Sequence, residues 1–259
     1  MAASSIETVV DDPRVTAQFC RSIRHQAGEV VLLGAVHDHP ASVGRVRTVI
    51  ERVEPDTLAL ELPAAAIPLY RAYARDERSP PRFGGEMSAA IDAVSSAEVV
   101  GIDAPNWPFV RRLVARLVAD RVSPSTARRV LSSLGNATRD ALTSRVAATV
   151  TDATSLTVAA DEPVSYSCTR ADDPETQAAH ERAHVAGVRA LLGGTQDEAE
   201  RPTAYRDDAR ERCMVEQLRA RQTDGSVVAV VGADHLDALE AGLSDSLSGG
   251  SRRRSSSSN

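Results

Sequence analysis

The chain has 259 residues, of which 42% are hydrophobic and only 3% aromatic, so we expect a core of Val, Leu, Ile and Ala, as in parallel sheets covered by helices. The net charge of −6 excludes a basic, non-specific nucleic-acid binder, and because every basic side chain is an arginine, lysine-based Schiff-base chemistry and the lysine-dependent P-loop are excluded as well. Three widely spaced cysteines, and no apolar run long enough for a signal peptide or a membrane span, predict a cytoplasmic protein.

The first half of the chain predicts strands that alternate with helices. An almost unbroken apolar run predicts a buried strand over 30–36. Ser42 is expected to cap the helix that follows, and the next strand is predicted over 57–62. A helix over 86–97 and a strand over 98–103 come after a loop rich in Gly and Pro. Strands joined through helices pair in parallel, which predicts an α/β fold with a mostly parallel central sheet flanked by helices.

The second half is dominated by helical patterns. We expect a helical insert over about residues 107–225, followed by a last strand over 227–231 that is as apolar as the first. Towards its end the chain turns to Ser, Gly and Arg, a composition that buries too little apolar surface to fold. The sequence therefore predicts one α/β domain over 1–244 and a disordered tail over 245–259.

Polar side chains stand at or just past the end of each predicted strand, and one opens a helix. They are His37 with Asp38 and His39, then Glu61, then Asp103, then Asp234 with His235, and Glu86 at the start of the helix. In an open parallel sheet, ligands collect outside the carboxyl ends of the strands. Two imidazoles and two or three carboxylates suit a divalent metal such as Zn, Mn or Co, and a carboxylate beside the metal could serve as general base in hydrolysis.

Each of these residues also has a purely structural interpretation. A histidine after a strand is often a turn residue that is hydrogen-bonded to the backbone. Glu86 could simply favour a helix N-terminus through the helix dipole. Glu61 is harder to explain by packing alone, because it interrupts an apolar run and a carboxylate near a core needs a charged or hydrogen-bonding partner.

Five segments resemble motifs of the TraB/PrgY/GumN/Tiki family, in the order in which the family has them. They are VLLGAVHDHPAS, similar to the first Gly-x-x-His motif; PDTLALELP, similar to the second strand; GGEMSAAIDA, similar to the Gly-x-Glu helix; RERCMVEQL, similar to the Glu-Arg helix; and VVAVVGADHL, similar to the second Gly-x-x-His strand. The resemblance runs from about residue 30 to residue 242. Together the five matches are fairly specific.

The resemblance implies a fold shared with the EreA/ChaN-like proteins. In that group the Tiki branch is a metal-dependent protease, while other members bind a peptide pheromone or haem. Carried over by position, the implied metal-site residues are His37, Glu61, Glu86 and His235, with Glu61 or Glu86 also able to act as base. Glu211 and Arg212 match the Glu-Arg pair, and the resemblance implies that Arg212 steadies a carboxylate or holds an oxyanion.

The chain departs from the family pattern at two positions. The family often has an arginine shortly after the Glu-Leu of the second strand, where this chain reads Pro-Ala-Ala-Ala, and another after the Asp of the third strand, where Ala104 stands. The loss of two positive charges predicts altered specificity, or binding without turnover. The membrane helices that end many family members are absent from this sequence.

A competing motif lies in the predicted insert. His180, Glu181 and His184 spell His-Glu-x-x-His, and Gly187 continues the metzincin spacing, but Ala190 stands where the third histidine would be. Three interpretations stay open: a zincin site, an accessory metal contact, and a solvated face of an amphipathic helix, which the flanking sequence favours.

Two functions lead at this point, ahead of a zincin centred on His180 and a purely structural or interaction protein. The leading one is a metal-dependent hydrolase that acts on a peptide or a related amide. The alternative is a non-catalytic protein that binds a peptide, haem or another small ligand in the same cleft. The expected partner is a peptide or small-molecule ligand, and the sequence leaves open whether the chain forms a homo-oligomer.

Overall fold

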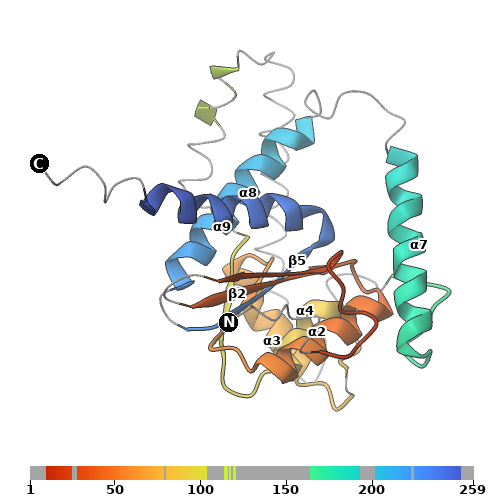
Figure 1. Cartoon of the computed structure of the whole chain (residues 1–259). Helices are drawn as coiled ribbons and strands as arrows, with labels where there is room; N and C mark the ends of the chain where they lie inside the picture. Colours follow the sequence, from red (N-terminus) through yellow and green to blue (C-terminus); the bar gives the residue numbers. More distant parts are fainter. Residues whose placement is uncertain are drawn as a thin grey trace, which may run out of the picture.

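A five-stranded sheet forms the centre of the molecule (Figure 1). The computed structural model describes residues 10–24, 28–78, 80–103, 114–115, 117, 119–120, 164–192, 202–222 and 225–251. The strands are β1 (Cys20–Arg24), β2 (Glu29–Ala35), β3 (Thr57–Leu60), β4 (Glu98–Gly101) and β5 (Val227–Gly232). They lie in the order β1-β2-β5-β3-β4, with β1 antiparallel to β2 and all other neighbours parallel. The predicted α/β class with a mostly parallel sheet is confirmed.

The last strand in the chain lies in the middle of the sheet. β5 runs between β2 and β3, with Ala35 paired to Gly232 on one side and Leu60 paired to Val230 on the other. Every side chain from Val227 to Val231 is buried. A strand covered on both faces has no reason to alternate polar and apolar residues, which explains why β2 and β5 read as continuous apolar runs. The carboxyl ends of β2, β5 and β3 therefore lie side by side.

The edge strand β1 is not predicted by the sequence pattern. Only Cys20 and Ile23 among its residues are buried, and the others are polar. It pairs antiparallel with β2, from Cys20 opposite Leu33 to Arg24 opposite Glu29. Charged side chains suit an edge strand because they discourage pairing with another chain. They also remove the apolar pattern by which a strand is recognised.

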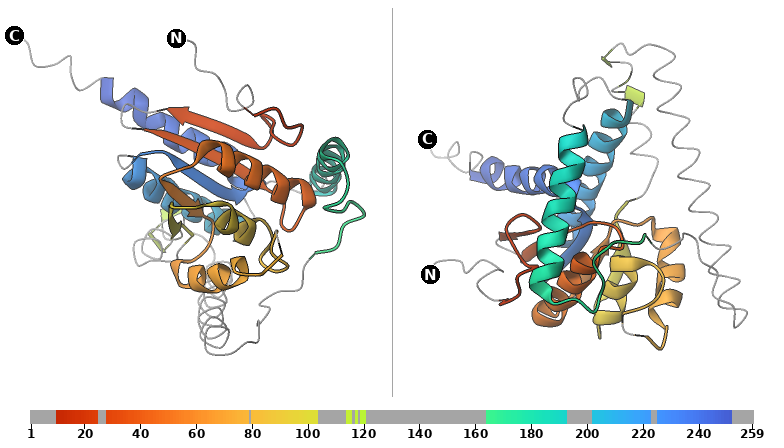
Figure 2. Two further views of the ribbon diagram at one scale, coloured as in Figure 1. Left: turned by 90° about the horizontal axis from the view of Figure 1, so that it is seen from below. Right: turned by 90° about the vertical axis from the view of Figure 1, so that its right-hand side faces the viewer.

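Helices cover both faces of the sheet (Figure 2). One face carries α2 (Pro40–Val53), the short η1 (Ala64–Ala66), α3 (Ile67–Ala74) and α4 (Gly85–Ala93). The other face carries α8 (Pro202–Arg221) and α9 (Leu236–Ser251), while α7 (Pro174–Leu192) packs beside α2. The result is a layered α/β arrangement.

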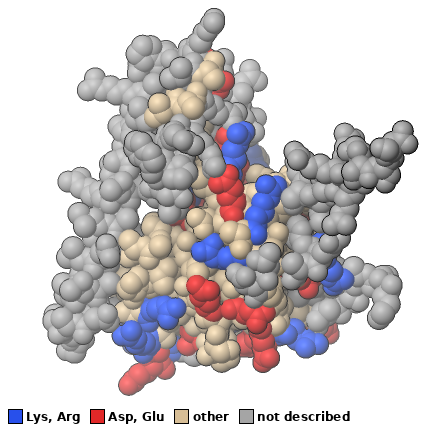
Figure 3. Space-filling view, turned by 90° about the vertical axis from the view of Figure 1, so that its left-hand side faces the viewer, with Lys and Arg blue, Asp and Glu red and all other residues tan. Residues whose placement is uncertain are grey.

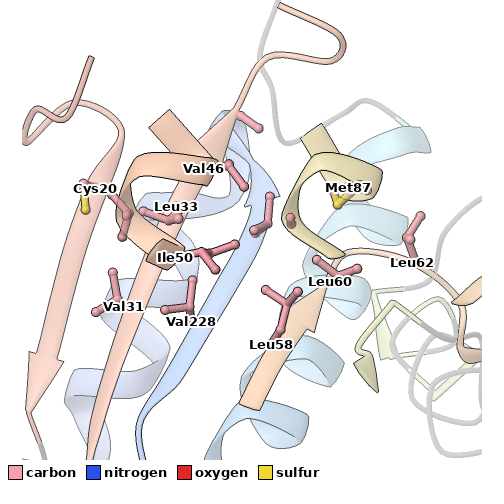
Figure 4. Packing of buried hydrophobic residues seen from close by; sticks show 14 of the residues in the cluster. Cys20, Val31, Leu33, Val46, Ile50, Leu58, Leu60, Leu62, Met87 and Val228 are labelled. Carbon is pink, nitrogen blue, oxygen red and sulfur yellow. The ribbon is translucent and has the colours of Figure 1, made fainter. Parts of the chain in front are cut away.

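Alternate residues of one strand enter opposite cores. Val31 and Leu33 of β2 join the cluster that contains Ile50 of α2 (Figure 4). Leu32 points the other way, into the cluster that contains Leu218 of α8. Because each fully buried aliphatic side chain stabilises the fold by about 1.5–3 kcal/mol, the two cores together hold the central strands and fix their register.

The start of α2 differs from the prediction. The helix begins at Pro40, and His39 is its N-cap: Nδ1 of His39 accepts a hydrogen bond from the amide of Ala41 at 3.1 Å. Ser42 is instead buried in the first turn, where its hydroxyl accepts from the amide of Val36 at 2.8 Å. The prediction of Ser42 as the cap was wrong because proline suits the first turn of a helix, which shifts the cap to the residue before it.

The predicted insert and tail fall only partly on described residues. Between β4 and β5, the described part of the insert at about 107–225 contains α7 and α8, and the remainder lies outside the described residues. α9 continues to Ser251, so the predicted boundary at 244 lies within a helix. Leu236, Leu239 and Leu243 bury one side of this helix against the sheet, and the helix extends beyond them. Residues 252–259 of the predicted tail lie outside the described residues.

The surface mixes charges of both signs. On the face in Figure 3, acidic and basic side chains of the described residues lie among one another rather than in separate areas. Partly exposed ion pairs, such as Arg21 with Glu240 at 2.8 Å, contribute about 0–1 kcal/mol each. No helix within the described part of the chain is long and apolar enough to cross a membrane.

Candidate functional site

Polar side chains lie just beyond the carboxyl ends of neighbouring parallel strands. His37 and Asp38 follow β2, Glu61 follows β3, and His235 ends the short η4 (Ala233–His235) that follows β5. Asp103 comes just after β4. Because β2, β5, β3 and β4 are successive parallel neighbours, these residues share one edge of the sheet. They form two separate clusters there.

The first group, the His37 cluster, consists of His37, Asp38 and Glu86. Nδ1 of His37 lies 3.3 Å from Oε1 of Glu86, and Nε2 of His37 lies 3.5 Å from Oδ2 of Asp38. The amide of Asp38 donates to Oε2 of Glu86 at 2.9 Å. One potential ligand atom from each of the three residues lies within 4.8 Å of the other two. The spacing is compatible with one cation bound by all three.

Two glycines make this approach possible. Gly84 and Gly85 have φ angles of +78° and +48°, the left-handed region that glycine adopts without strain. A Cβ at Gly85 would collide with the carboxylate of Asp38. Asp38 itself has a φ of 57°, which aspartate tolerates better than most residues. The Gly-Gly pair therefore brings Glu86, at the start of α4, against the loop after β2.

The two carboxylates of the His37 cluster are nearly buried and have no arginine partner among the described residues. The exposed fraction of the side chain is 9% for Asp38 and 4% for Glu86, against 54% for His37. Among the described residues, no arginine lies within ion-pair distance of either carboxylate, and Oδ2 of Asp38 accepts from the amide of Val164 at 2.9 Å. Buried carboxylates are normally paired with a cation or coordinate a metal. One imidazole and two carboxylates fit Zn, Mn or Co.

The second group, the His235 cluster, consists of Glu61, Asp103, Arg210, Glu211 and His235. Nδ1 of His235 lies 2.8 Å from Oε1 of Glu211, and Nε2 lies 3.3 Å from Oε1 of Glu61. Arg210 donates through Nη2 to Glu61 at 2.6 Å and to Asp103 at 2.8 Å. Oε2 of Glu61 accepts from the amide of Gly232 at 2.6 Å. Both oxygens of Glu61 and both ring nitrogens of His235 are thus engaged.

These contacts determine the charge states in the His235 cluster. Burial by itself lowers the pKa of His235, but hydrogen bonds to Glu211 and Glu61 outweigh it and raise the pKa to about 10. Burial would raise the pKa of Glu61, yet the contacts with His235, the Gly232 amide and Arg210 hold it below its usual value. At neutral pH, therefore, His235 is an imidazolium and Glu61 a carboxylate.

The four predicted metal-site residues are divided between the two clusters. His37 lies with Glu86, and Glu61 lies with His235. Within the described residues, only in the His37 cluster do ligand atoms from three His, Cys, Asp or Glu residues all lie within 4.8 Å of one another. Its third member, Asp38, follows His37 directly past the end of the same strand, but it was not among the four predicted metal-site residues.

Arg210 takes the position expected of Arg212. The side chain of Arg212 is 60% exposed and pairs with Asp208 at 3.2 Å, outside both clusters. Two residues along an α-helix turn the side chain by about 200°, so Arg210 and Arg212 project from opposite sides of α8. Arg210 steadies the carboxylates of Glu61 and Asp103 and supplies a positive charge at this edge.

The His-Glu-x-x-His segment on α7 is anchored through its glutamate. Glu181 and Arg45 are both fully buried, with contacts of 2.7 Å and 3.0 Å between guanidinium and carboxylate, and the hydroxyl of Ser42 also donates to Glu181. The expectation of a solvated face was wrong for Glu181, because Arg45 of α2 lies opposite it. A zincin base needs a free carboxylate, and both oxygens here hold Arg45.

The histidine of this segment nearest to α2 belongs to a hydrogen-bonded chain. His39 Nδ1 accepts from the amide of Ala41, its Nε2 lies 2.9 Å from Nδ1 of His180, and Nε2 of His180 lies 2.8 Å from the hydroxyl of Ser167. Burial lowers the pKa of His39 to about 4, so its ring is neutral and donates through Nε2. The chain fixes α7 against the start of α2.

No family model matches this chain, and no curated protein and no solved structure shows a significant similarity to it. Its function must therefore be inferred from the chemistry of the two clusters and from the sequence motifs that form them.

Proposed function

We propose that this chain is a metal-dependent hydrolase of the TraB/Tiki type that acts on a peptide or a related amide. The observation that carries the proposal is the approach of two nearly buried carboxylates, Asp38 and Glu86, to the exposed imidazole of His37. The resemblance to the TraB/PrgY/GumN/Tiki family supports it, since His37 and Glu86 stand in two of the matching motifs.

His37, Asp38 and Glu86 would hold a divalent cation. Such a cation polarises a carbonyl and lowers the pKa of a water molecule, which is the chemistry that amide hydrolysis requires. The two carboxylates would balance its charge, and the amide of Asp38 holds Glu86 in place before any substrate binds. The exposed His37 marks the side from which a substrate can reach the cluster.

The His235 cluster would serve the same reaction from the neighbouring strand end. His235 carries a proton at neutral pH, which it would release from its carboxylate partners to the departing amine, and the proton freed from the attacking water would restore it. Glu61 and Glu211 orient the ring from its two nitrogens, and Asp103 orients Arg210. In this scheme Glu86 contributes to the cation site, while Glu61 positions His235 and Arg210.

A ligand-binding protein without turnover is the second candidate. The specific observation in its favour is that Glu61 and His235 are fully engaged with one another, Arg210, Glu211 and the backbone, so this cluster presents no free base. The same edge of the sheet would then bind a peptide, haem or another small ligand.

Metal content tests the proposal. The full chain is loaded with Zn, Mn or Co, dialysed and measured by mass spectrometry, and we expect about one equivalent of metal per chain. His37→Ala and Glu86→Gln should lose the metal, because each removes one of the three ligands. His180→Ala is the matched control, since it removes an imidazole on α7 and should leave the metal content unchanged. Circular dichroism verifies that each variant folds.

The outcomes separate the candidate functions. Cleavage of a peptide library by the loaded protein, lost together with the metal in His37→Ala, supports the hydrolase. Metal binding without cleavage of any peptide supports the ligand-binding protein. Retention of metal in both His37→Ala and Glu86→Gln contradicts the metal site at the His37 cluster and with it the hydrolase proposal. Loss of metal only in His180→Ala shifts the site to α7.

A further inference from the structure

A cavity lined by arginines opens beside the His37 cluster. It has a volume of about 410 Å³, and Arg78, Arg82, Arg170, Asp38 and Tyr166 are among its lining residues. The arginines come from two separate parts of the chain, the loop before α4 and the segment that leads into α7. The cavity is thus a meeting point of two loops rather than a groove along one element.

The three arginines have no acidic partner within ion-pair distance in the described part of the chain. Arg170 donates through Nη1 to the carbonyls of Pro80 and Pro81, at 3.4 Å and 3.1 Å, and its other N–H groups have no partner among the described residues. The carboxylate of Asp76 accepts from the backbone amides of Arg78 and Arg82 and not from their guanidinium groups.

Arginine side chains that have no acidic partner can bind an anion. The guanidinium group presents a planar set of donors that matches a carboxylate or a phosphate. The chain has a net charge of −6 and therefore more acidic than basic side chains. Even so, the three arginines around this cavity have no acidic partner among the described residues. Desolvation lowers the pKa of Arg170, while the nearby charge of Asp38 acts in the opposite direction.

The cavity and the His37 cluster share residues. Asp38 belongs to the cluster and lines the cavity, and its Oδ2 accepts from the amide of Val164 at 2.9 Å, a residue that lines the cavity as well. The hydroxyl of Tyr166 donates to the backbone carbonyl of His37 at 2.7 Å. A molecule bound at His37 could therefore extend into the cavity.

We propose that Arg78, Arg82 and Arg170 bind an anionic group, a carboxylate or a phosphate, on the molecule that the His37 cluster acts on. This inference deepens the proposed function and rests on it for the identity of that molecule. The substrate class is thus an acidic peptide or another amide that carries a carboxylate or phosphate group.

Calorimetric titration of the full chain with inorganic phosphate and with succinate tests the inference. Arg170→Gln and Arg82→Gln should each weaken binding by about tenfold or more, the usual effect of losing a hydrogen bond to a charged group. Arg189→Gln is the matched control, because it removes the same charge from the exposed last turn of α7 and should leave binding unchanged. Binding of phosphate alone or succinate alone identifies the anionic group.

Two variants distinguish anion binding in the cavity from metal binding at the His37 cluster. His37→Ala should keep anion binding while it loses metal, and Arg170→Gln should keep metal while it loses anion binding. Equal binding by Arg189→Gln and both cavity variants overturns the inference, as does the absence of binding to the wild-type chain. Loss of anion binding in His37→Ala also overturns it, because the anion would then sit on the metal.

Discussion

Two histidines of this protein have different charge states at neutral pH, because their hydrogen-bonding partners differ. His235 faces a carboxylate at each ring nitrogen and has a pKa of about 10. His39 is buried between a backbone amide and another imidazole and has a pKa of about 4. Burial acts in the same direction on both, so the hydrogen-bonding partners decide the difference.

The protonation of His235 predicts a stability that depends on pH. The folded chain keeps this proton up to pH about 10, whereas an unfolded histidine loses it near 6.5, so the folded state binds more protons between these values. The stabilisation is fully present below pH 6.5, and the free energy of unfolding should fall as pH rises from there to about 10. Urea denaturation across this range should show a loss on the order of a few kcal/mol.

His235→Gln is the control for this prediction. It removes the titrating ring, so its unfolding free energy should vary less over the same pH range, while the contributions of other titrating groups remain. Parallel pH profiles for the wild type and this variant would show that His235 is not protonated above its ordinary pKa.

At the scale of elements, α7 is attached to α2 by a buried ion pair. Arg45 and Glu181 have fully buried side chains that contact each other at 2.7 Å. Arg45 also donates to the carbonyl of Gly34 at 2.6 Å, which links both helices to the end of β2. The ion pair therefore holds α7 near the edge that carries the His37 cluster.

Removal of one partner should be costly. Arg45→Met leaves the Glu181 charge buried and uncompensated, and we expect a loss of about 3–5 kcal/mol in the free energy of unfolding, measured by urea denaturation. Arg182→Met is the matched control on α7, because Arg182 and its partner Glu175 are 42% and 74% exposed and their contact of 3.9 Å should contribute less than about 1 kcal/mol.

The same pair decides the role of the His-Glu-x-x-His segment. Glu181→Gln should destabilise the protein, since it weakens the buried pair, and should leave the metal content unchanged. A stable Glu181→Gln variant that has lost hydrolytic activity would instead identify Glu181 as a zincin base.

At the scale of the whole molecule, the sheet brings residues from distant segments to one edge. A cation that binds only the folded chain stabilises it by mass action, by about 2.7 kcal/mol at a hundredfold excess over the Kd. Addition of Zn or Mn should therefore raise the Tm by several degrees, and a chelator should reverse the effect. Scanning calorimetry measures both.

Two variants test whether the cation that raises the Tm binds at the His37 cluster. Asp38→Asn should abolish the rise in Tm because it removes a ligand of the His37 cluster. Asp103→Asn, in the His235 cluster, should keep the rise even if it lowers the starting Tm. The same rise in both variants would place the cation elsewhere in the molecule.

The sequence by itself determined the central strands and the polar residues at their ends. β2 and β5 are apolar runs of strand length, and Glu61 breaks such a pattern with a charge that needs a partner, so local chemistry sufficed to single them out. The edge strand β1 and the cap at His39 escaped prediction, because a short polar strand and a histidine cap have no distinctive pattern of their own.

Only the tertiary structure decided which polar residues meet. The insertion of β5 between β2 and β3, the left-handed turn at Gly85 and the direction in which α8 presents Arg210 divide the candidates into two clusters. The partner of Glu181 and the grouping of three arginines likewise depend on contacts between distant segments. The physical reason is that charge pairing acts through space between side chains, whereas a sequence pattern records only spacing along the chain.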